Sequence, residues 1–139
     1  MNFNKVILHC SATKESQDIG FKEIDSWHKA KGWKGCGYHF IIRRDGTTET
    51  GRPVTERGAH AKGYNDCIGV CFVGGIDDIG KPEDNFTEAQ HNSFYTLMLC
   101  LRMIFGNVKI KGHCDLPNVN KACPSFDVVE KYGEKFCNE

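Results

Sequence analysis

The chain has 139 residues, with 18 basic (Lys and Arg) and 18 acidic (Asp and Glu) side chains, so its formal net charge is zero. A length of this order predicts a single domain, spanning residues 1–139, with a hydrophobic core of its own. The neutral balance argues against a protein that coats nucleic acid, because such proteins are usually basic. No apolar run approaches the ~20 residues needed to cross a bilayer. We therefore expect direct contact with neither nucleic acid nor a membrane.

The eight cysteines raise the question of a disulfide framework. The N-terminal stretch MNFNKVILHC has an apolar run of only three residues, far short of the core of a signal peptide. Without a signal peptide we expect a reducing cytoplasm, in which thiols stay free. The sequence thus favours free cysteines over disulfides.

In the first half of the chain, the hydrophobic pattern predicts one helix among short strands. Aromatic and apolar residues at helical spacing, followed by Gly32, indicate an amphipathic helix over 20–31 with Trp27 in the core. The Asp45-Gly46 pair between two β-prone runs predicts a hairpin. The strands expected in this half cover residues 5–8, 37–43 and 47–50.

In the second half, a capping signature opens the clearest helix. Thr87 is followed three residues later by Gln90, the spacing of a capping box. The apolar face of this helix comprises Phe94, Leu97, Met98, Leu101 and Phe105. A central strand, a last strand and a short C-terminal helix are expected over 67–73, 108–111 and 128–136. Interleaved strands and helices predict an α/β fold with a central mixed sheet flanked by helices.

The segment GHCDLPNVNKACPSF, residues 112–126, gathers reactive side chains between turn-forming residues. Its prolines disfavour a helix or strand interior, so we expect a loop carrying His113, Lys121 and Cys123. If the first and last strands are neighbours, His9 at the end of the first strand meets His113. Two His and one Cys would leave the fourth position of a tetrahedral Zn²⁺ open, as in catalytic zinc sites.

Residue types alone leave that ligand set open. Cys36, His39 and Cys114 are alternative ligands in a chain with six histidines and eight cysteines. His9 is also explained as a strand histidine with satisfied hydrogen bonds, and Cys123 as a small buried apolar residue.

Three further residues have two interpretations each. Strand alternation places Tyr38 on the face of Phe40 and Ile42, either as a core aromatic or as a phenol at a pocket. Lys121 is either a solvated lysine or a cation aimed at an oxyanion. His60, in a glycine-rich loop, is either a surface histidine or a binding residue.

Five segments of the chain resemble the zinc-dependent N-acetylmuramoyl-L-alanine amidases, a family shared by small phage endolysins and peptidoglycan recognition proteins. They occur in the same order and with near-identical spacing. The segments are HCSATK (9–14), GYHFIIRRDGTTETGR (37–52), GAHAKGYN (58–65), IGVCFVGGIDD (68–78) and KACPSFD (121–127).

The resemblance implies a site and a reaction. The family's zinc ligands fall on His9, His113 and Cys123, and its catalytic tyrosine and lysine fall on Tyr38 and Lys121. The implied enzyme is a bacteriolytic hydrolase, an endolysin that uses one Zn²⁺ to cleave the amide between N-acetylmuramic acid and L-alanine in bacterial peptidoglycan. Host cell lysis would follow.

The resemblance also implies features outside the metal ligands. It places His60 in the substrate groove. The match is closest to phage amidases that also inhibit the phage RNA polymerase, which implies that polymerase as a second partner. We expect a monomer that waits in the host cytoplasm and then acts on the bacterial cell wall. The alternatives are a non-catalytic peptidoglycan-binding module, a transcription regulator and a zinc endopeptidase.

Overall fold

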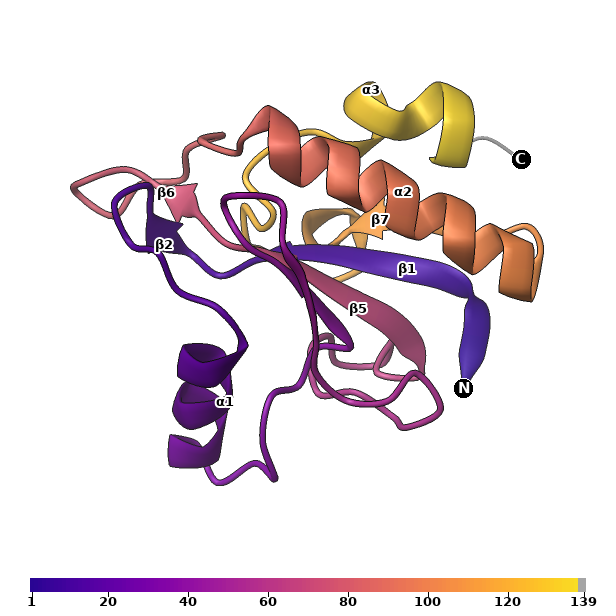
Figure 1. Cartoon of the computed structure of the whole chain (residues 1–139), viewed down its shortest axis with the longest axis horizontal. Coiled ribbons are helices and arrows are strands. Elements are labelled where there is room, and N and C mark those ends of the chain that lie inside the picture. Colours follow the sequence, from indigo (N-terminus) through magenta and orange to yellow (C-terminus); the bar gives the residue numbers. More distant parts are fainter. Residues whose placement is uncertain (138–139) are drawn as a thin grey trace.

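A five-stranded mixed sheet forms the middle of the molecule in the order β4-β3-β5-β1-β7 (Figure 1). The computed structural model describes residues 1–137. Three of the pairings, β1 with β5, β1 with β7 and β3 with β5, are parallel, and β3 with β4 is antiparallel. The strands are β1 (Asn2–Cys10), β3 (Phe40–Ile42), β4 (Thr48–Thr50), β5 (Cys67–Phe72) and β7 (Lys109–Gly112). The predicted α/β fold with a central mixed sheet is confirmed.

The first and last strands are neighbours, which is the condition under which His9 and His113 can belong to one site. In the parallel pair of β1 and β7, Leu8 lies opposite Gly112. His9 follows Leu8 and His113 follows Gly112, so the register brings their side chains to the same end of the sheet. β1 is longer than expected and contains His9 as its penultimate residue.

Two expectations about strands were wrong. The second strand is shorter than residues 37–43, and Tyr38 precedes β3 and packs with Ile41 rather than on the face of Phe40 and Ile42. The alternation rule fails there because it holds only inside a regular strand. Short strands β2 (Thr13–Lys14) and β6 (Gly75–Ile76) pair with each other outside every stretch that was predicted as a strand. Two residues are too few to give a periodic signal.

Figure 1 shows α2 and α3 on one side of β1 and α1 on the other. The helices are α1 (Phe21–Ala30), α2 (Glu88–Phe105) and α3 (Val128–Tyr132), which continues as a π turn over Gly133–Cys137. The predicted capping box is present, since Thr87 and Gln90 exchange side-chain and backbone hydrogen bonds. Trp27 is 44% exposed, so the expectation that it belongs to the core was wrong.

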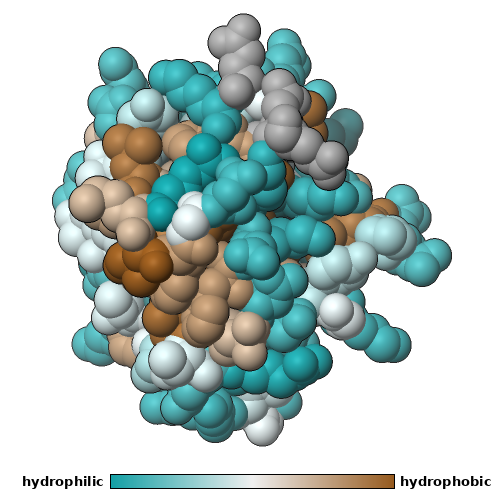
Figure 2. All heavy atoms as spheres, turned by 90° about the vertical axis from the view of Figure 1, so that its right-hand side faces the viewer, coloured by the Kyte–Doolittle hydropathy of each residue, from teal (hydrophilic) through white to brown (hydrophobic). Residues whose placement is uncertain are grey.

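The main core lies between the sheet and the pair α2 and α3. Val6 and Leu8 of β1 face it, whereas Ile7 belongs to a separate cluster on the other face. Phe94, Met98 and Leu101 are the most buried apolar side chains of α2. Its last turn instead exposes Met103 and Ile104, at the end of the molecule where Figure 2 shows an apolar patch.

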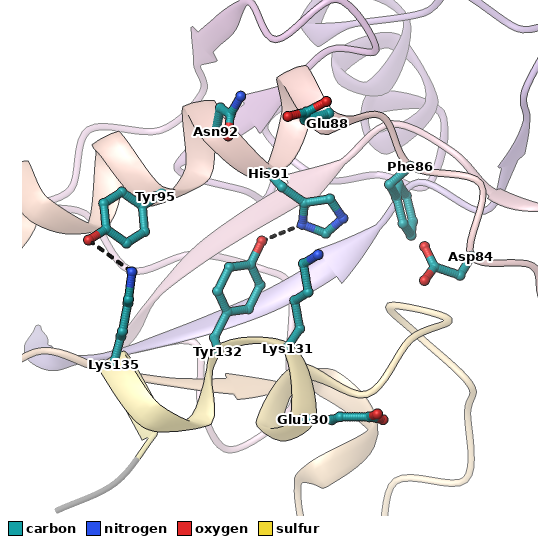
Figure 3. Close-up of a pocket in the computed structure, with 10 residues that line it drawn as sticks. All are labelled: Asp84, Phe86, Glu88, His91, Asn92, Tyr95, Glu130, Lys131, Tyr132 and Lys135. Atoms are coloured by element: carbon teal, nitrogen blue, oxygen red, sulfur yellow. Dashed lines mark hydrogen bonds between the residues drawn. The ribbon is translucent and has the colours of Figure 1, made fainter.

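A cavity of about 780 Å³ lies between α2 and α3 (Figure 3). His91 of α2 is hydrogen-bonded to the hydroxyl of Tyr132, and the Lys135 ammonium lies 3.4 Å from the Tyr95 hydroxyl. These contacts join α3 to α2 over the sheet. No helix within residues 1–137 combines the length and apolar character needed to cross a membrane.

Candidate metal centre

All six residues singled out in the sequence line one cavity of about 420 Å³. They come from the end of β1, the approach to β3, the loop between β4 and β5 and the segment after β7, and are His9, Tyr38, His60, His113, Lys121 and Cys123. The alternative ligands Cys36, His39 and Cys114 do not line it. The fold therefore joins segments that are far apart in the sequence.

Within residues 1–137, one group of His, Cys, Asp or Glu side chains is arranged to hold a metal ion: His9, His113 and Cys123. Their donor atoms all lie within 4.8 Å of one another, and Nδ1 of His9 is 3.9 Å from Sγ of Cys123. The rings of His9 and His113 have centroids 4.6 Å apart. His9 is 2% exposed, while the other two are half-buried, so the cluster is open on one side.

Both imidazoles of the cluster are electrically neutral at neutral pH. Burial, with smaller contributions from the nearby His60, His113 and Lys121, holds the pKa of His9 well below its usual range. Burial and Lys121 lower the pKa of His113 as well. A neutral imidazole has a free lone pair, which is the form that binds a metal.

Cys123 is held against the end of β1. Its Sγ accepts a hydrogen bond of 3.2 Å from the backbone N–H of Cys10, and a cis peptide bond joins it to Pro124. The neighbouring Cys10 thiol and burial raise the pKa of Cys123, so a metal has to displace its proton on binding. The seven cysteines whose side chains are described are all free, as expected: Cys10, Cys36, Cys67, Cys71, Cys100, Cys114 and Cys123.

Tyr38 lines the cavity beside His9. Its ring is 5.2 Å from that of His9, centroid to centroid. Burial first, and then the thiols of Cys71, Cys123 and Cys10, raise the pKa of Tyr38 well above its usual range. The phenol therefore keeps its hydrogen at neutral pH and can donate a hydrogen bond.

Lys121 brings a positive charge to the mouth of the cavity. Its side chain is exposed, and no ion pair holds it among residues 1–137. It is close enough to His9 and His113 to depress the pKa of both. No Asp or Glu belongs to the described lining of this cavity, so negative charge that develops on a bound substrate would meet mainly cations.

His60 stands where the cavity opens into a longer groove of about 1160 Å³. The groove is lined by the segment after α1, the loop between β4 and β5 and the segment after β7, with residues that include Trp33, Arg57, Lys62, Tyr64 and Asn120. Its mixed aromatic, cationic and amide lining can stack on sugar rings and bind carboxylates. The side chain of His60 also contacts His9, through a hydrogen bond of 2.9 Å between ring nitrogens.

Sequence reasoning missed several residues that build this region. Cys10 and Ser125 line the cavity with their side chains 3.8 Å apart. Gly69, inside the apolar strand β5, lies under the ring of His60. An isolated glycine in a strand is a known signal of a close approach, so Gly69 could have been noticed.

An open cluster of two imidazoles and a thiol, set on a mixed sheet beside a long groove, has the donor set and the free side that catalytic metal sites use. The sequence comparison is more specific. The family model for N-acetylmuramoyl-L-alanine amidase matches residues 1–126. The chain belongs to the N-acetylmuramoyl-L-alanine amidase family.

Relatives of known name agree with this assignment. The chain is 51% identical over 131 residues to the endolysin of Enterobacteria phage T3, covering 94% of this chain and 85% of that one. It is 50% identical over 131 residues to the endolysin of Escherichia phage T7, with the same coverage. Among solved structures it resembles the amidase LysC of Clostridium intestinale URNW, with a TM-score of 0.77 and 30% identity over 94% of this chain and 83% of that one.

Proposed function

We propose that this protein is a zinc-dependent endolysin that cleaves the amide bond between N-acetylmuramic acid and L-alanine in bacterial peptidoglycan. Family membership supports the peptidoglycan amidase activity. The observation that carries the site assignment is the convergence of His9, His113 and Cys123, two imidazoles and one thiol within 4.8 Å, in a cavity that also holds Tyr38 and Lys121.

The donor set fits zinc. Tetrahedral bonds of about 2.0 Å to nitrogen and about 2.3 Å to sulfur place the two donor atoms about 3.6 Å apart. Nδ1 of His9 and Sγ of Cys123 are 3.9 Å apart, so little movement is needed. Three protein ligands leave a coordination position for water. When bound, zinc lowers the pKa of such a water towards neutrality and supplies a Lewis acid.

The side chains of the cavity have separate roles in the hydrolysis. Water adds to the amide carbonyl carbon, the carbon–nitrogen bond breaks, and L-alanine leaves with a proton on its nitrogen. The Lys121 ammonium stabilises the negative charge that develops on the carbonyl oxygen. The protonated Tyr38 phenol donates a hydrogen bond to the attacking water or to that oxygen. The groove beside them orients the glycan and the stem peptide.

Analysis of the products from purified peptidoglycan tests this proposal. New L-alanine amino termini without new reducing sugar ends are expected. New reducing ends would identify a glycosidase, and amino termini from other residues would identify a zinc endopeptidase. Protein that sediments with peptidoglycan but creates no new ends would be a binding module.

The remaining expectations are separate proposals with their own tests. We infer a monomer, to be measured by sedimentation, and one domain over residues 1–139, to be tested by a single unfolding transition. Accumulation in the host cytoplasm before lysis would be seen by fractionation of infected cells. Inhibition of the phage RNA polymerase remains a prediction, which a pull-down with the cognate polymerase and a transcription assay would test.

A further inference from the structure

The imidazole of His60 bridges the backbone of β5 and the side chain of His9. Its Nε2 lies 3.0 Å from the carbonyl oxygen of Cys67, and its Nδ1 lies 2.9 Å from Nε2 of His9. The two rings meet edge to face, with centroids 4.9 Å apart. Both nitrogens of His60 are thus occupied by protein partners.

These two contacts fix where the hydrogens lie. A carbonyl oxygen only accepts, so Nε2 of His60 carries the hydrogen of the neutral ring and donates it to Cys67. Nδ1 of His60 is then an acceptor, and Nε2 of His9 has to be the donor. The lone pair of the neutral His9 ring is left on Nδ1, the atom 3.9 Å from Sγ of Cys123. The bare nitrogen of His9 therefore faces the other ligands.

Two glycines, Gly58 and Gly69, leave the space that the His60 ring occupies. A Cβ atom at Gly69 would lie 2.5–2.7 Å from ring atoms of His60, and one at Gly58 would lie 2.6 Å from Cδ2 of that ring. Neither distance is tolerated by packed atoms, so β5 and the loop both leave space for the imidazole. The other described residues of β5 are apolar and fully buried, and only Gly69 lacks a side chain.

The loop that carries His60 is closed on itself by Asn65. The Asn65 side-chain oxygen accepts hydrogen bonds from the backbone N–H groups of His60 (2.7 Å) and Ala61 (2.8 Å). The Asn65 carbonyl accepts a third, of 2.8 Å, from Gly58. Backbone and ring of His60 are therefore both held in place before any ligand binds.

We propose that His60 is a positioning residue that holds His9 in the tautomer and orientation required to bind the metal, and that it sets the metal affinity of the site rather than binding the substrate. The proposal rests on the proposed function only in taking His9 as a ligand. Hydrogen-bond partners of ligating histidines typically contribute 10–100-fold to metal affinity.

Two substitutions separate this role from simple filling of space. His60→Phe keeps a planar ring and removes both nitrogens. His60→Asn places an amide oxygen near the position of Nδ1 and so retains an acceptor for His9. The matched control is His91→Phe, because His91 is a half-buried histidine of α2, on the opposite face of the sheet.

Zinc affinity of the metal-stripped full chain is measured by competition with a chromophoric chelator. We expect His60→Phe to bind zinc ~10–100-fold more weakly and His60→Asn less than ~10-fold more weakly. His91→Phe should match the parent. Parental zinc affinity in His60→Phe would overturn the proposal. If the same variant also had a raised KM for peptidoglycan, His60 would be a substrate contact instead.

A second measurement uses the unsubstituted protein and needs no catalysis. In ¹⁵N NMR spectra of the metal-free chain, Nε2 should carry the hydrogen in both His9 and His60. A hydrogen on Nδ1 of either ring would overturn the proposal even if the variants failed to fold. A protein with the expected zinc affinities and tautomers that left peptidoglycan intact would refute the amidase function and leave the role of His60 standing.

Discussion

The two faces of the sheet differ in kind although they are built from the same strands. In β1, Val6 and Leu8 point into an apolar core under α2 and α3, whereas the neighbouring His9 lies in the cavity that holds Tyr38 and His60. One face is closed by helices and filled with aromatic rings. The other is covered only in part, by α1, and carries a cavity lined by imidazoles, thiols and two lysines.

The two faces have different roles, one in the stability of the fold and the other in the chemistry of the site. Apolar burial under the helices supplies most of the folding free energy, since it scales with the apolar area removed from water. The polar groups of the open face are costly to bury but have partners: in the part of the chain described, no buried side-chain nitrogen or oxygen lacks one. Substitutions on the two faces should therefore have separable effects on stability and activity.

The largest effect on stability is expected from Phe94→Ala. Phe94 is 0% exposed, and its ring contacts those of Phe72 and Tyr132 at centroid distances of 5.4 and 5.2 Å. Removing a buried aromatic ring typically costs about 3–5 kcal/mol of unfolding free energy. Urea unfolding should show this loss, while the rate per folded molecule stays at the parental value. A loss below about 1 kcal/mol would mean that this face contributes little.

On the open face, Lys121→Ala should lower kcat about 100–1000-fold, equivalent to about 2.7–4 kcal/mol in the activation barrier. The free energy of unfolding and the bound zinc should not change, because the side chain is exposed. Lys111→Ala, which removes an exposed lysine of β7, is the matched control and should retain the parental rate. Equal effects of the two variants would remove Lys121 from the chemistry.

Acid should destabilise the metal-free protein. Burial lowers the pKa of all six histidines, that of His60 to about 4. The unfolded chain, with pKa values near 6.5, then binds protons before the folded one, so stability is full above pH ~6.5 and falls as the pH drops towards ~4. Urea titrations across this range should lose at least about 3 kcal/mol, which is the contribution of His60 alone. A flat profile would contradict buried neutral histidines.

The smallest effect is expected at the start of α2. Thr87 caps this helix by accepting a hydrogen bond of 3.1 Å from the backbone of Gln90, and its hydroxyl donates to the carbonyl of Arg44 at 2.6 Å. Thr87→Ala should cost about 1 kcal/mol. Thr87→Ser, which keeps the hydroxyl, should cost less. Thermal unfolding of the two variants makes the comparison, and an unchanged midpoint in Thr87→Ala would show that the cap is dispensable.

Local features of this protein could be read from the sequence. The capping box at Thr87, the Asp45-Gly46 hairpin and the apolar strand β5 each depend on residues close together in the chain. The pairing of β1 with β7 was only a condition for uniting His9 with His113, and the structure meets that condition. Tyr38 was assigned to the wrong face because the irregular backbone before β3 has no sequence signature.

Features that depend on long-range contacts were out of reach. The hydrogen bond between His9 and His60 joins residues 51 positions apart. It depends on Gly69, which has no side chain to displace the His60 ring. The backbone N–H of Cys10 reaches Cys123 across 113 positions. No local sequence pattern predicts such pairs, so the hydrogen-bond partners of His9 and Cys123 are visible only in the structure.

Zinc titration of metal-stripped protein tests the assignment of the open face most directly. Release of L-alanine amino termini from peptidoglycan is measured at increasing zinc, in the parent and in Cys123→Ser. We predict no release without metal, a rise that saturates at about one zinc per chain, and little recovery in the variant. Full activity of the stripped parent, or full recovery of Cys123→Ser at one equivalent, would contradict a metal centre formed by His9, His113 and Cys123.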